Sequence, residues 1–247
     1  MNFSLPHSTN PLVAVNTHYE SDKKSGKIHY RYIVGNMYIE GIIKSKGLPL
    51  IVPKTENEAV LDLYAEKADA FLFIGGPDYP PEFYGEDAIP EDMSCKNKRP
   101  FADLYLMRKA IASKKPVLGI CAGEQLLSIA SGGKLIQHVK TADQHTGEKY
   151  HKARICGGNI LKSLIEGDSF EINSSHHQAV NPKFQGKGLL ISAFAEDGTV
   201  EAIEGTGREF RLGLQFHIER HKGKKFRKRV FDLLIKKAEE YRNEQKN

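Results

Sequence analysis

A cysteine with a glycine two positions away on each side has the residue types and spacing of a nucleophile. The segment Gly119-Ile120-Cys121-Ala122-Gly123 follows a short apolar run, residues 116–118, and precedes a helix-like stretch, residues 124–131. This pattern is typical of a nucleophile elbow, a sharp strand-to-helix turn on which small flanking residues let the backbone bend. The N-terminus of the following helix would favour the thiolate. The alternative is a buried structural cysteine in a tight turn. The catalytic interpretation therefore requires that the chain also supply a base.

A histidine and a carboxylate near the end of the chain could provide that base. In Gln215-Phe216-His217-Ile218-Glu219, the spacing predicts that His217 and Glu219 lie on the same side of an extended chain. His217 would take the thiol proton of Cys121, and Glu219 would fix the ring tautomer and stabilise the imidazolium. Taken alone, the pair could be a strand-end histidine beside a surface carboxylate; the cysteine elbow favours the catalytic interpretation.

Adjacent histidines in Asn173-Ser174-Ser175-His176-His177-Gln178 are a second group of reactive side chains. Metal binding is one interpretation, but no third ligand stands at a typical spacing, so the sequence predicts no metal site. We expect instead a loop that faces the active site, in which Ser175, His176 and His177 bind substrate. Histidines satisfied at the surface are the remaining alternative.

Two glycines after an earlier apolar run are candidates for stabilising an oxyanion. A cysteine that attacks a carbonyl needs hydrogen-bond donors for the negative charge that develops on the oxygen. We assign these donors to the backbone N–H groups of Gly75 and Gly76 and of Ala122, the residue after Cys121. A Gly-Gly pair after a strand is, by itself, commonly only a turn.

These residues require a scaffold that brings distant segments together. Apolar runs predict buried strands at residues 12–15, 48–52 and 70–74 and around Val117. The intervening patterns predict helices at residues 30–46, closed by Gly47, at 56–67, with Thr55 as N-cap, and at 101–113. Such alternation indicates a three-layer, doubly wound α/β fold with a mostly parallel central sheet. Ligands gather at the carboxyl ends of parallel strands, so Gly75, Gly76 and Cys121 are expected to meet there.

The second half of the chain indicates an additional, smaller antiparallel portion. Short segments separated by Gly, Asn and Asp predict strands at residues 134–138, 153–156, 189–195, 200–204 and 212–216. Residues 220–247 carry 11 Lys/Arg and 4 Asp/Glu, but apolar residues from Phe226 onward recur at helical spacing. This favours a basic, amphipathic C-terminal helix over a nucleic-acid-binding patch. Without repeats or low-complexity linkers, residues 1–247 are expected to form a single domain.

Composition and cysteine usage restrict the setting. The 247-residue chain is 40% hydrophobic and has a net charge of +5, and it contains no run of about 18 apolar residues. We therefore predict neither a membrane span nor secretion. Cys95, Cys121 and Cys156 are widely spaced and form no Cys-x-x-Cys pair, which favours a reducing, cytoplasmic setting without disulfides or zinc. No cofactor is predicted, and the oligomeric state stays open, with a homodimer as one expectation.

Taken in order, these motifs resemble those of the class I glutamine amidotransferase-like hydrolases, and within them the γ-glutamyl-γ-aminobutyrate hydrolase group of cysteine peptidases. The matching segments span nearly the whole chain: Gly75-Gly76-Pro77-Asp78 with Pro80-Pro81 and Tyr84-Gly85, residues 116–125, residues 132–137, residues 173–178 and residues 214–217. The resemblance implies a flavodoxin-like arrangement of strands and helices over the whole chain.

The resemblance also implies a chemistry. A Cys121–His217–Glu219 triad would cleave a γ-glutamyl amide through a γ-glutamyl thioester, which water hydrolyses to release glutamate. Gln125 and residues 175–177 would lie near the glutamyl group of this small-molecule substrate. No synthetase domain is fused to the sequence, which favours a free-standing hydrolase. The alternatives are a glutaminase subunit that supplies ammonia to a separate synthase, and a γ-glutamyl-binding regulatory protein with impaired catalysis.

Two positions depart from the pattern of the group. Ala122 stands where the group usually has Arg, and Ile218 stands where it usually has Pro. A backbone donor survives at Ala122, but any role of a guanidinium is lost. The amine attached to the γ-glutamyl group and the pathway are left open by the sequence.

Overall fold

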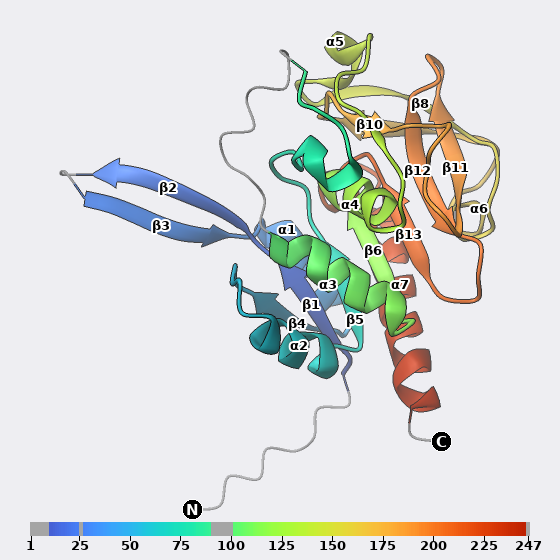
Figure 1. Cartoon of the computed structure of the whole chain (residues 1–247). Helices are drawn as coiled ribbons and strands as arrows, with labels where there is room; N and C mark the ends of the chain where they lie inside the picture. Colours follow the sequence, from blue (N-terminus) through green and yellow to red (C-terminus); the bar gives the residue numbers. More distant parts are fainter. Residues whose placement is uncertain (1–9, 25–26, 90–100, 246–247) are drawn as a thin grey trace, which may run out of the picture.

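A nine-stranded sheet forms the centre of the computed structural model, which describes residues 10–24, 27–89 and 101–245 (Figure 1). Its strands, in spatial order, are β4 (Leu48–Val52), β1 (Leu12–Asn16), β5 (Ala70–Phe73), β6 (Val117–Ile120), β13 (Arg211–Leu214), β12 (Val200–Gly205), β11 (Leu189–Ala195), β8 (Lys149–Ile155) and β9 (Ser169–Ser174). The pairings from β4 to β13 are parallel, and those from β13 to β9 are antiparallel. The expected α/β fold is confirmed, and its antiparallel portion continues the same sheet.

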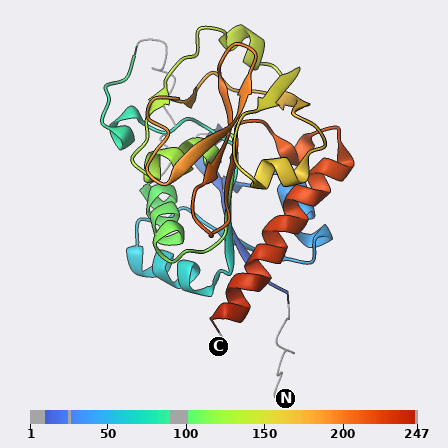
Figure 2. The ribbon, with the colours of Figure 1, turned by 90° about the vertical axis from the view of Figure 1, so that its right-hand side faces the viewer.

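Helices cover both faces of the parallel part of the sheet. On one face lie α1 (Asn36–Lys44) and α7 (Lys224–Glu244), and on the other lie α2 (Glu58–Lys67), α3 (Phe101–Ala112) and α4 (Ala122–Ala130). Figure 2 shows α7, in red, on the opposite side of the sheet from α2 and α4. Successive strand residues alternate between the two layers, since Val13 and Val15 pack with α1 and α7, whereas Ala14 packs with α2 to α4. The C-terminal segment is therefore a packed amphipathic helix.

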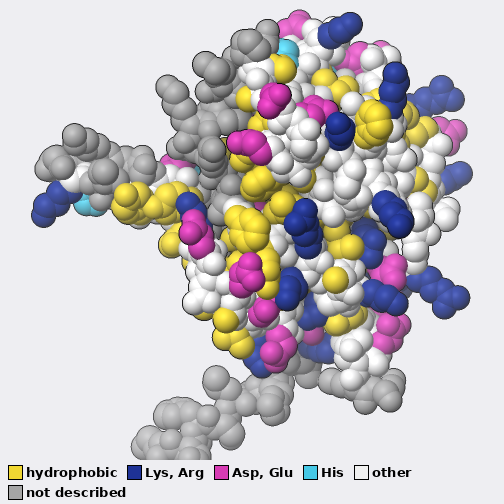
Figure 3. Space-filling model, viewed as in Figure 1, with side chains coloured by type: hydrophobic (Ala, Val, Ile, Leu, Met, Phe, Trp, Pro, Cys, Tyr) yellow, Lys and Arg dark blue, Asp and Glu magenta, His cyan; other side chains and the backbone are white. Residues whose placement is uncertain are grey.

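A two-stranded arm replaces the start of the helix predicted at residues 30–46. Strand β2 (His18–Lys24) pairs antiparallel with β3 (Lys27–Ile33), and the helix begins only at Asn36. Tyr30 and Tyr32 are 62% and 52% exposed, and Figure 3 shows hydrophobic side chains along this arm. The prediction was wrong here because the apolar residues of the arm pair across a hairpin and do not face the core.

Two predicted helix caps were also wrong. The helix α1 ends at Lys44 with Ser45 as its C-cap, and the residue with a left-handed backbone is Lys46, at φ 70°, rather than Gly47. Gly47 instead lies close to the side chains between α1 and α7, since a Cβ there would lie 2.4 Å from Cδ1 of Ile235. At the start of α2, the side chain of Asn57, not that of Thr55, accepts the N–H groups of the first turn.

The remaining segments are short. They comprise β7 (Leu135–Ile136) paired with β10 (Ala179–Val180), α5 (Ala142–His145), α6 (Ile160–Leu164) and two 3₁₀ turns, Pro81–Tyr84 and Ile218–Arg220. The strands predicted at residues 134–138 and 212–216 are shorter than expected, and the one at 153–156 begins earlier, at Lys149. Cys95 lies outside the described residues. Among those that are described, no helix combines the length and apolar composition needed to cross a bilayer.

The carboxyl ends of three neighbouring strands bring the candidate site together. Strands β5, β6 and β13 are adjacent and parallel, and they end immediately before the segments that contain Gly75, Cys121 and His217. Such an edge is where open α/β sheets bind their ligands. Segments separated by about 45 and 95 residues in the sequence therefore meet because of strand order.

Candidate active site

Cys121 lies on a strained turn between β6 and α4. Its backbone has φ 52° and ψ −110°, a conformation that L-residues other than glycine rarely adopt; holding it costs about 1–3 kcal/mol. The flanking glycines are required by close backbone contacts, since a Cβ on Gly119 would lie 2.4 Å from the Gly123 oxygen. A Cβ on Gly123 would lie 2.1 Å from the Phe73 oxygen. The structure therefore has the geometry of a nucleophile elbow at Cys121.

His217 and Glu219 lie beside the cysteine at the end of β13. The Cys121 N–H donates to the Leu214 oxygen at 2.7 Å, which fixes the two strand ends relative to each other. His217 Nδ1 and Glu219 Oε1 are 2.8 Å apart, and both side chains are buried. The prediction that the pair lies on an extended strand was wrong. The chain turns at His217 into the 3₁₀ turn Ile218–Arg220, and this turn brings the carboxylate back to the ring.

The environment of His217 favours its charged form. Burial alone would lower the pKa of His217, but the sulfur of Cys121 and the carboxylate of Glu219 outweigh it and raise this pKa to about 10. The imidazolium is therefore stable at neutral pH when the sulfur carries a negative charge. This is the ion pair that a cysteine nucleophile and its acid–base partner require.

The Gly75 turn packs directly against the histidine ring. A Cβ on Gly75 would lie 2.7 Å from Cε1 of His217, so only glycine lets the ring occupy its place. The Gly75 N–H donates to the hydroxyl of Tyr38 at 3.2 Å, and Asn16 Oδ1 accepts the N–H of Ile74 at 2.8 Å. Burial and the nearby charges of Glu219 and Cys121 raise the pKa of Tyr38 well above its ordinary value, so its hydroxyl stays protonated.

The residues expected to supply oxyanion donors lie next to Cys121 in the chain or line the same cleft. Gly75 and Gly76 line the same cleft as Cys121. Ala122 is the first residue of α4, and the first N–H groups of a helix have no acceptor within it. The side chain of Ala122 is buried in the core beneath α4, so this position offers only its backbone to a substrate.

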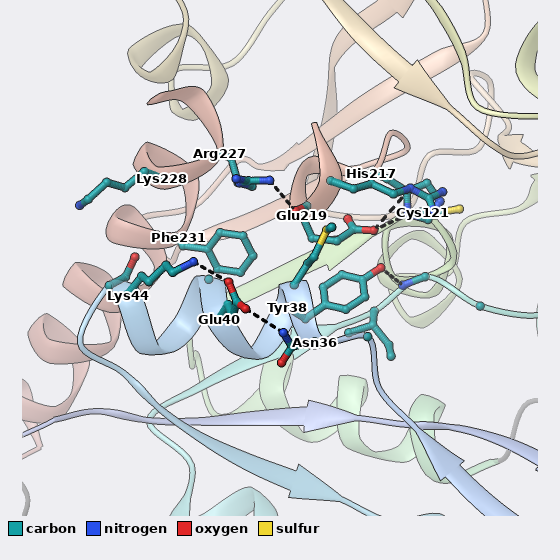
Figure 4. Close-up of a pocket in the computed structure, with 18 of the residues that line it drawn as sticks. Asn36, Tyr38, Glu40, Lys44, Cys121, His217, Glu219, Arg227, Lys228 and Phe231 are labelled. Atoms are coloured by element: carbon teal, nitrogen blue, oxygen red, sulfur yellow. Dashed lines mark hydrogen bonds and ion pairs between the residues drawn. The ribbon is translucent and has the colours of Figure 1, made fainter. Parts of the chain in front are cut away.

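The cleft above Cys121 has a basic rim (Figure 4). Its volume is about 1260 Å³, and its charged lining residues include Lys44, Arg220, Lys224, Arg227 and Lys228, with Glu40 and Glu219 as the acidic members. Within the rim, Lys44 pairs with Glu40 and Arg227 donates to the backbone oxygen of Glu219 at 3.1 Å. The positive side chains would attract a substrate that carries carboxylates.

The four residues expected near the substrate lie in different places. Ser175 lines the cleft with Cys121, whereas Gln125, His176 and His177 are not among its lining residues. His177 Nε2 lies 2.9 Å from Oδ2 of Asp78, so it connects the Ser175 loop to the loop that follows Gly75 and Gly76. His176 is buried and points toward Glu201 in the antiparallel part of the sheet.

Gln125 contributes to the site through Gln215, a residue to which no sequence motif assigned a role. The Gln125 amide donates to the backbone oxygen of Gln178 at 3.1 Å and to Oε1 of Gln215 at 3.2 Å. Gln215 Nε2 in turn donates to the sulfur of Cys121 at 3.6 Å. The signal for Gln215 was its place two residues before His217; Tyr38 gave no signal, because its contact with Gly75 depends on how α1 packs.

A buried carboxyl lies under the elbow. Glu124, in the first turn of α4, is fully buried, and burial together with the charges of Glu201 and Cys121 raises its pKa well above the ordinary range. Burial and these charges therefore favour the neutral form of the Glu124 carboxyl. A neutral Glu124 places no buried negative charge in the helix after Cys121, so it does not destabilise the thiolate.

Comparisons with known proteins agree with this geometry. The sequence model of the family described as peptidase C26 matches residues 11–219. Protein NtpR of Enterococcus hirae is 29% identical over 80% of this chain and 86% of its own length. A Mycobacterium tuberculosis protein provisionally named a glutamine amidotransferase is 33% identical over 74% of this chain and 61% of its own length. The γ-glutamyl-γ-aminobutyrate hydrolase of Escherichia coli O157:H7 is 28% identical over 78% of this chain and 81% of its own length.

A solved structure supports the fold. The crystal structure of a Thermoplasma acidophilum protein, provisionally assigned as part of a GMP synthase, superposes with a TM-score of 0.63. The superposition covers 96% of this chain and 99% of that one, at 16% sequence identity. At this identity the likeness concerns the arrangement of the strands and helices.

Proposed function

Because the chain belongs to the peptidase C26 family, a class I glutamine amidotransferase-like group, we propose that it is a hydrolase that cleaves the γ-glutamyl amide bond of small γ-glutamyl compounds. The observation that carries the proposal is the thiol of Cys121 on a strained elbow, beside the His217–Glu219 pair and open to a cleft with a basic rim. These are the parts needed for covalent acyl transfer.

In the proposed reaction, the thiolate of Cys121 attacks the γ-carbonyl carbon of the substrate. The oxyanion that forms would accept hydrogen bonds from the Ala122 N–H and from the Gly75-Gly76 turn, if the Tyr38 hydroxyl moves away from Gly75. As the C–N bond breaks, the His217 imidazolium gives its proton to the leaving amine, and a γ-glutamyl thioester remains.

Water completes the cycle. His217, now neutral, takes a proton from a water molecule whose oxygen attacks the thioester carbon. The C–S bond breaks, glutamate leaves, and the proton on His217 restores the ion pair with the thiolate. Glu219 holds the ring by its Nδ1 throughout, which leaves the other nitrogen for the proton transfers.

The charge of the cleft supports an anionic substrate. A γ-glutamyl group carries an α-carboxylate, and γ-aminobutyrate as leaving group adds a second one. Lys224 and Arg227 would therefore bind such a compound favourably, whereas Lys228 already pairs with Asp232. Ser175 is the residue of the predicted substrate loop that we assign to contact with the glutamyl group. Gln125 and His177 would position this site through Gln215 and Asp78.

A panel of substrates tests the proposal. Wild-type protein is incubated with γ-glutamyl-γ-aminobutyrate, other γ-glutamylamines, γ-glutamyl dipeptides and glutamine, and released glutamate is measured. Turnover should be lost in Cys121→Ala and retained in Cys156→Ala, which removes the exposed free cysteine of the described chain. Mass spectrometry should find the trapped γ-glutamyl adduct on Cys121.

The same experiment separates the alternatives. Several relatives are named amidotransferases, so a glutaminase subunit is the second candidate, and glutamine turnover only after addition of a synthase partner would favour it. Tight binding of γ-glutamyl compounds without turnover or labelling of Cys121 would instead indicate a regulatory protein and contradict the hydrolase proposal.

A further inference from the structure

Three histidines surround a buried carboxylate in the antiparallel part of the sheet. His145 ends α5, His151 lies on β8, His176 follows β9 and Glu201 lies on β12. Glu201 is 0% exposed, and His145 and His176 are buried, whereas the side chain of His151 is 21% exposed and reaches the surface. These four residues, which we call the Glu201 cluster, come from α5, β8, β12 and the loop after β9; Figure 1 labels α5, β8 and β12.

The distances within the Glu201 cluster suit a shared metal ion. Glu201 Oε1 lies 3.4 Å from His145 Nδ1, 3.0 Å from His151 Nε2 and 3.7 Å from His176 Nε2. Tetrahedral zinc, with ligand bonds of about 2.0–2.1 Å, places neighbouring donor atoms about 3.3 Å apart. The donor atoms of His145, His151 and Glu201 all lie within 4.8 Å of one another. Small movements of these three side chains would bring them around one ion. His176 stands outside this group of three, so it would have to move further to become the fourth ligand.

The second nitrogen of two histidines is held as it is in metal sites. His145 Nε2 lies 2.8 Å from Oδ2 of Asp197, and His176 Nδ1 donates to the backbone oxygen of Gln178 at 3.0 Å. Asp197 is itself held by the Thr199 N–H and the Thr141 hydroxyl. Metal-ligating histidines typically donate their outer N–H to such a carboxylate or carbonyl, which directs the other nitrogen at the metal.

Polar atoms inside the Glu201 cluster lack protein partners. Among the described residues, His151 Nδ1, His176 Nε2 and Glu201 Oε2 are buried without a hydrogen bond. Buried polar atoms without partners are rare, because each gives up its hydrogen bonds to water without a replacement. Three such atoms lie in one cluster of three histidines and one carboxylate. Two of them, His176 Nε2 and Glu201 Oε2, belong to the proposed ligand groups and leave coordination capacity for a ligand.

We propose that His145, His151, His176 and Glu201 bind one zinc ion. Imidazole nitrogens with a carboxylate form a donor set that zinc accepts and that magnesium and calcium, which prefer oxygen, do not. The ion connects α5, β8, β12 and the loop after β9. Because His176 directly follows Ser175, which lines the cleft, the zinc ion fixes the start of the loop that reaches the catalytic site.

Metal binding to untagged protein tests this directly. The protein is treated with a chelator, dialysed against Zn²⁺, and analysed for bound metal; we expect about one zinc ion per chain. Co²⁺ in place of Zn²⁺ should give the intense visible absorption of a tetrahedral site, and Mg²⁺ should not compete. His151→Ala should lose the zinc and the cobalt spectrum, while His29→Ala, an exposed histidine on β3, should retain both.

A milder variant keeps the test decisive if a ligand variant misfolds. Asp197→Asn keeps every proposed ligand and should weaken zinc affinity about 10- to 100-fold. Wild type that binds no more zinc than folded His151→Ala, or an Asp197→Asn variant with unchanged affinity, overturns the proposal and leaves a hydrogen-bonded cluster. The readout is independent of turnover, so it does not depend on the γ-glutamyl hydrolase proposal.

Discussion

Two buried histidine–carboxylate assemblies lie in the two parts of the same sheet. At the ends of the parallel strands, one carboxylate, Glu219, meets one ring, His217, and that ring faces a thiol and a cleft. In the antiparallel part, one carboxylate, Glu201, meets three rings. The same residue types thus serve different chemistry, because one arrangement leaves a ring nitrogen for proton transfer and the other directs several nitrogens at a single point.

The backbone supports the two assemblies differently. The parallel strands end in turns, and the Cys121 turn is strained so that its sulfur faces the cleft. The antiparallel strands instead carry ligands within or directly after regular segments, as Glu201 on β12 and His151 on β8 show. A strained turn exposes one reactive atom, whereas paired strands hold several donors at fixed spacing.

Removing the His217 ring, at the ends of the parallel strands, should have the largest effect on kcat/KM. His217→Ala takes away both the partner of the thiolate and the proton donor for the leaving amine, and we expect kcat/KM to fall on the order of 10⁴-fold or more. The same variant should bind zinc as the wild type does, since His217 is not in the Glu201 cluster. Steady-state kinetics and metal analysis on one preparation check both expectations.

A control and a contrary outcome accompany this test. His29→Ala, a surface histidine, should leave kcat/KM unchanged. If His217→Ala lost its zinc as well as its activity, the two assemblies would not be separable, and the comparison would fail.

The sequence located the first assembly far better than the second. Gly75 and Cys121 each follow an apolar run, so the rule that parallel strands end at one edge predicted their meeting. His217 was assigned from its chemistry as a base, because the strand before it was expected in the antiparallel portion, whereas β13 pairs parallel with β6. Glu201 could not be found in this way. It lies 50 residues from His151 along the chain, and the two meet only through β8, β11 and β12 of the sheet.

The fold was predictable where burial determines the hydrophobic pattern. Strands β1, β4, β5 and β6 were anticipated from their apolar runs. The arm of β2 and β3 was missed because Tyr30 and Tyr32 are exposed. Without contacts to the core, the described side chains of the arm have no alternation of buried and exposed residues that would identify its strands. The turn at His217 was missed for a related reason, since two residues of spacing fit an extended strand and a 3₁₀ turn equally well.

Replacing Glu219 tests how much its carboxylate raises the pKa of His217. The carboxylate helps to raise the pKa of His217 from 6.5 to about 10, so wild-type kcat/KM should fall on the alkaline side only near pH 10. Glu219→Gln lowers that pKa, so the alkaline fall should move to lower pH, and kcat/KM at neutral pH should drop about 10²- to 10⁴-fold.

A pH profile of kcat/KM distinguishes this role from a structural one. A loss of activity of the same factor at every pH, with the alkaline fall unmoved, would show that Glu219 only supports the fold. Thermal unfolding of Glu219→Gln serves as the check that the protein remains folded.

Gly75 tests how tightly the first assembly is packed. A Cβ at this position would lie 2.7 Å from Cε1 of His217, so Gly75→Ala should displace the ring and lower kcat about 10- to 100-fold with a smaller change in KM. Gly207→Ala is the matched control, because its Cβ meets only the flexible end of Glu209. An unchanged kcat in Gly75→Ala would mean that the ring can shift without loss of function.

The smallest expected effect concerns the charge around the cleft of the first assembly. Lys224 is an exposed member of the basic rim, so Lys224→Ala should raise KM for an anionic γ-glutamyl substrate while kcat stays the same. An exposed charge contributes ~0.2–1 kcal/mol, which corresponds to an increase of about 1.5- to fivefold, and added salt should reduce it. Lys225→Ala is the matched control, since its side chain pairs with Glu166 and does not line the cleft. Equal KM values for Lys224→Ala and Lys225→Ala at low salt would show that the rim does not select substrates by charge, and the specificity would then have to come from contacts nearer Ser175.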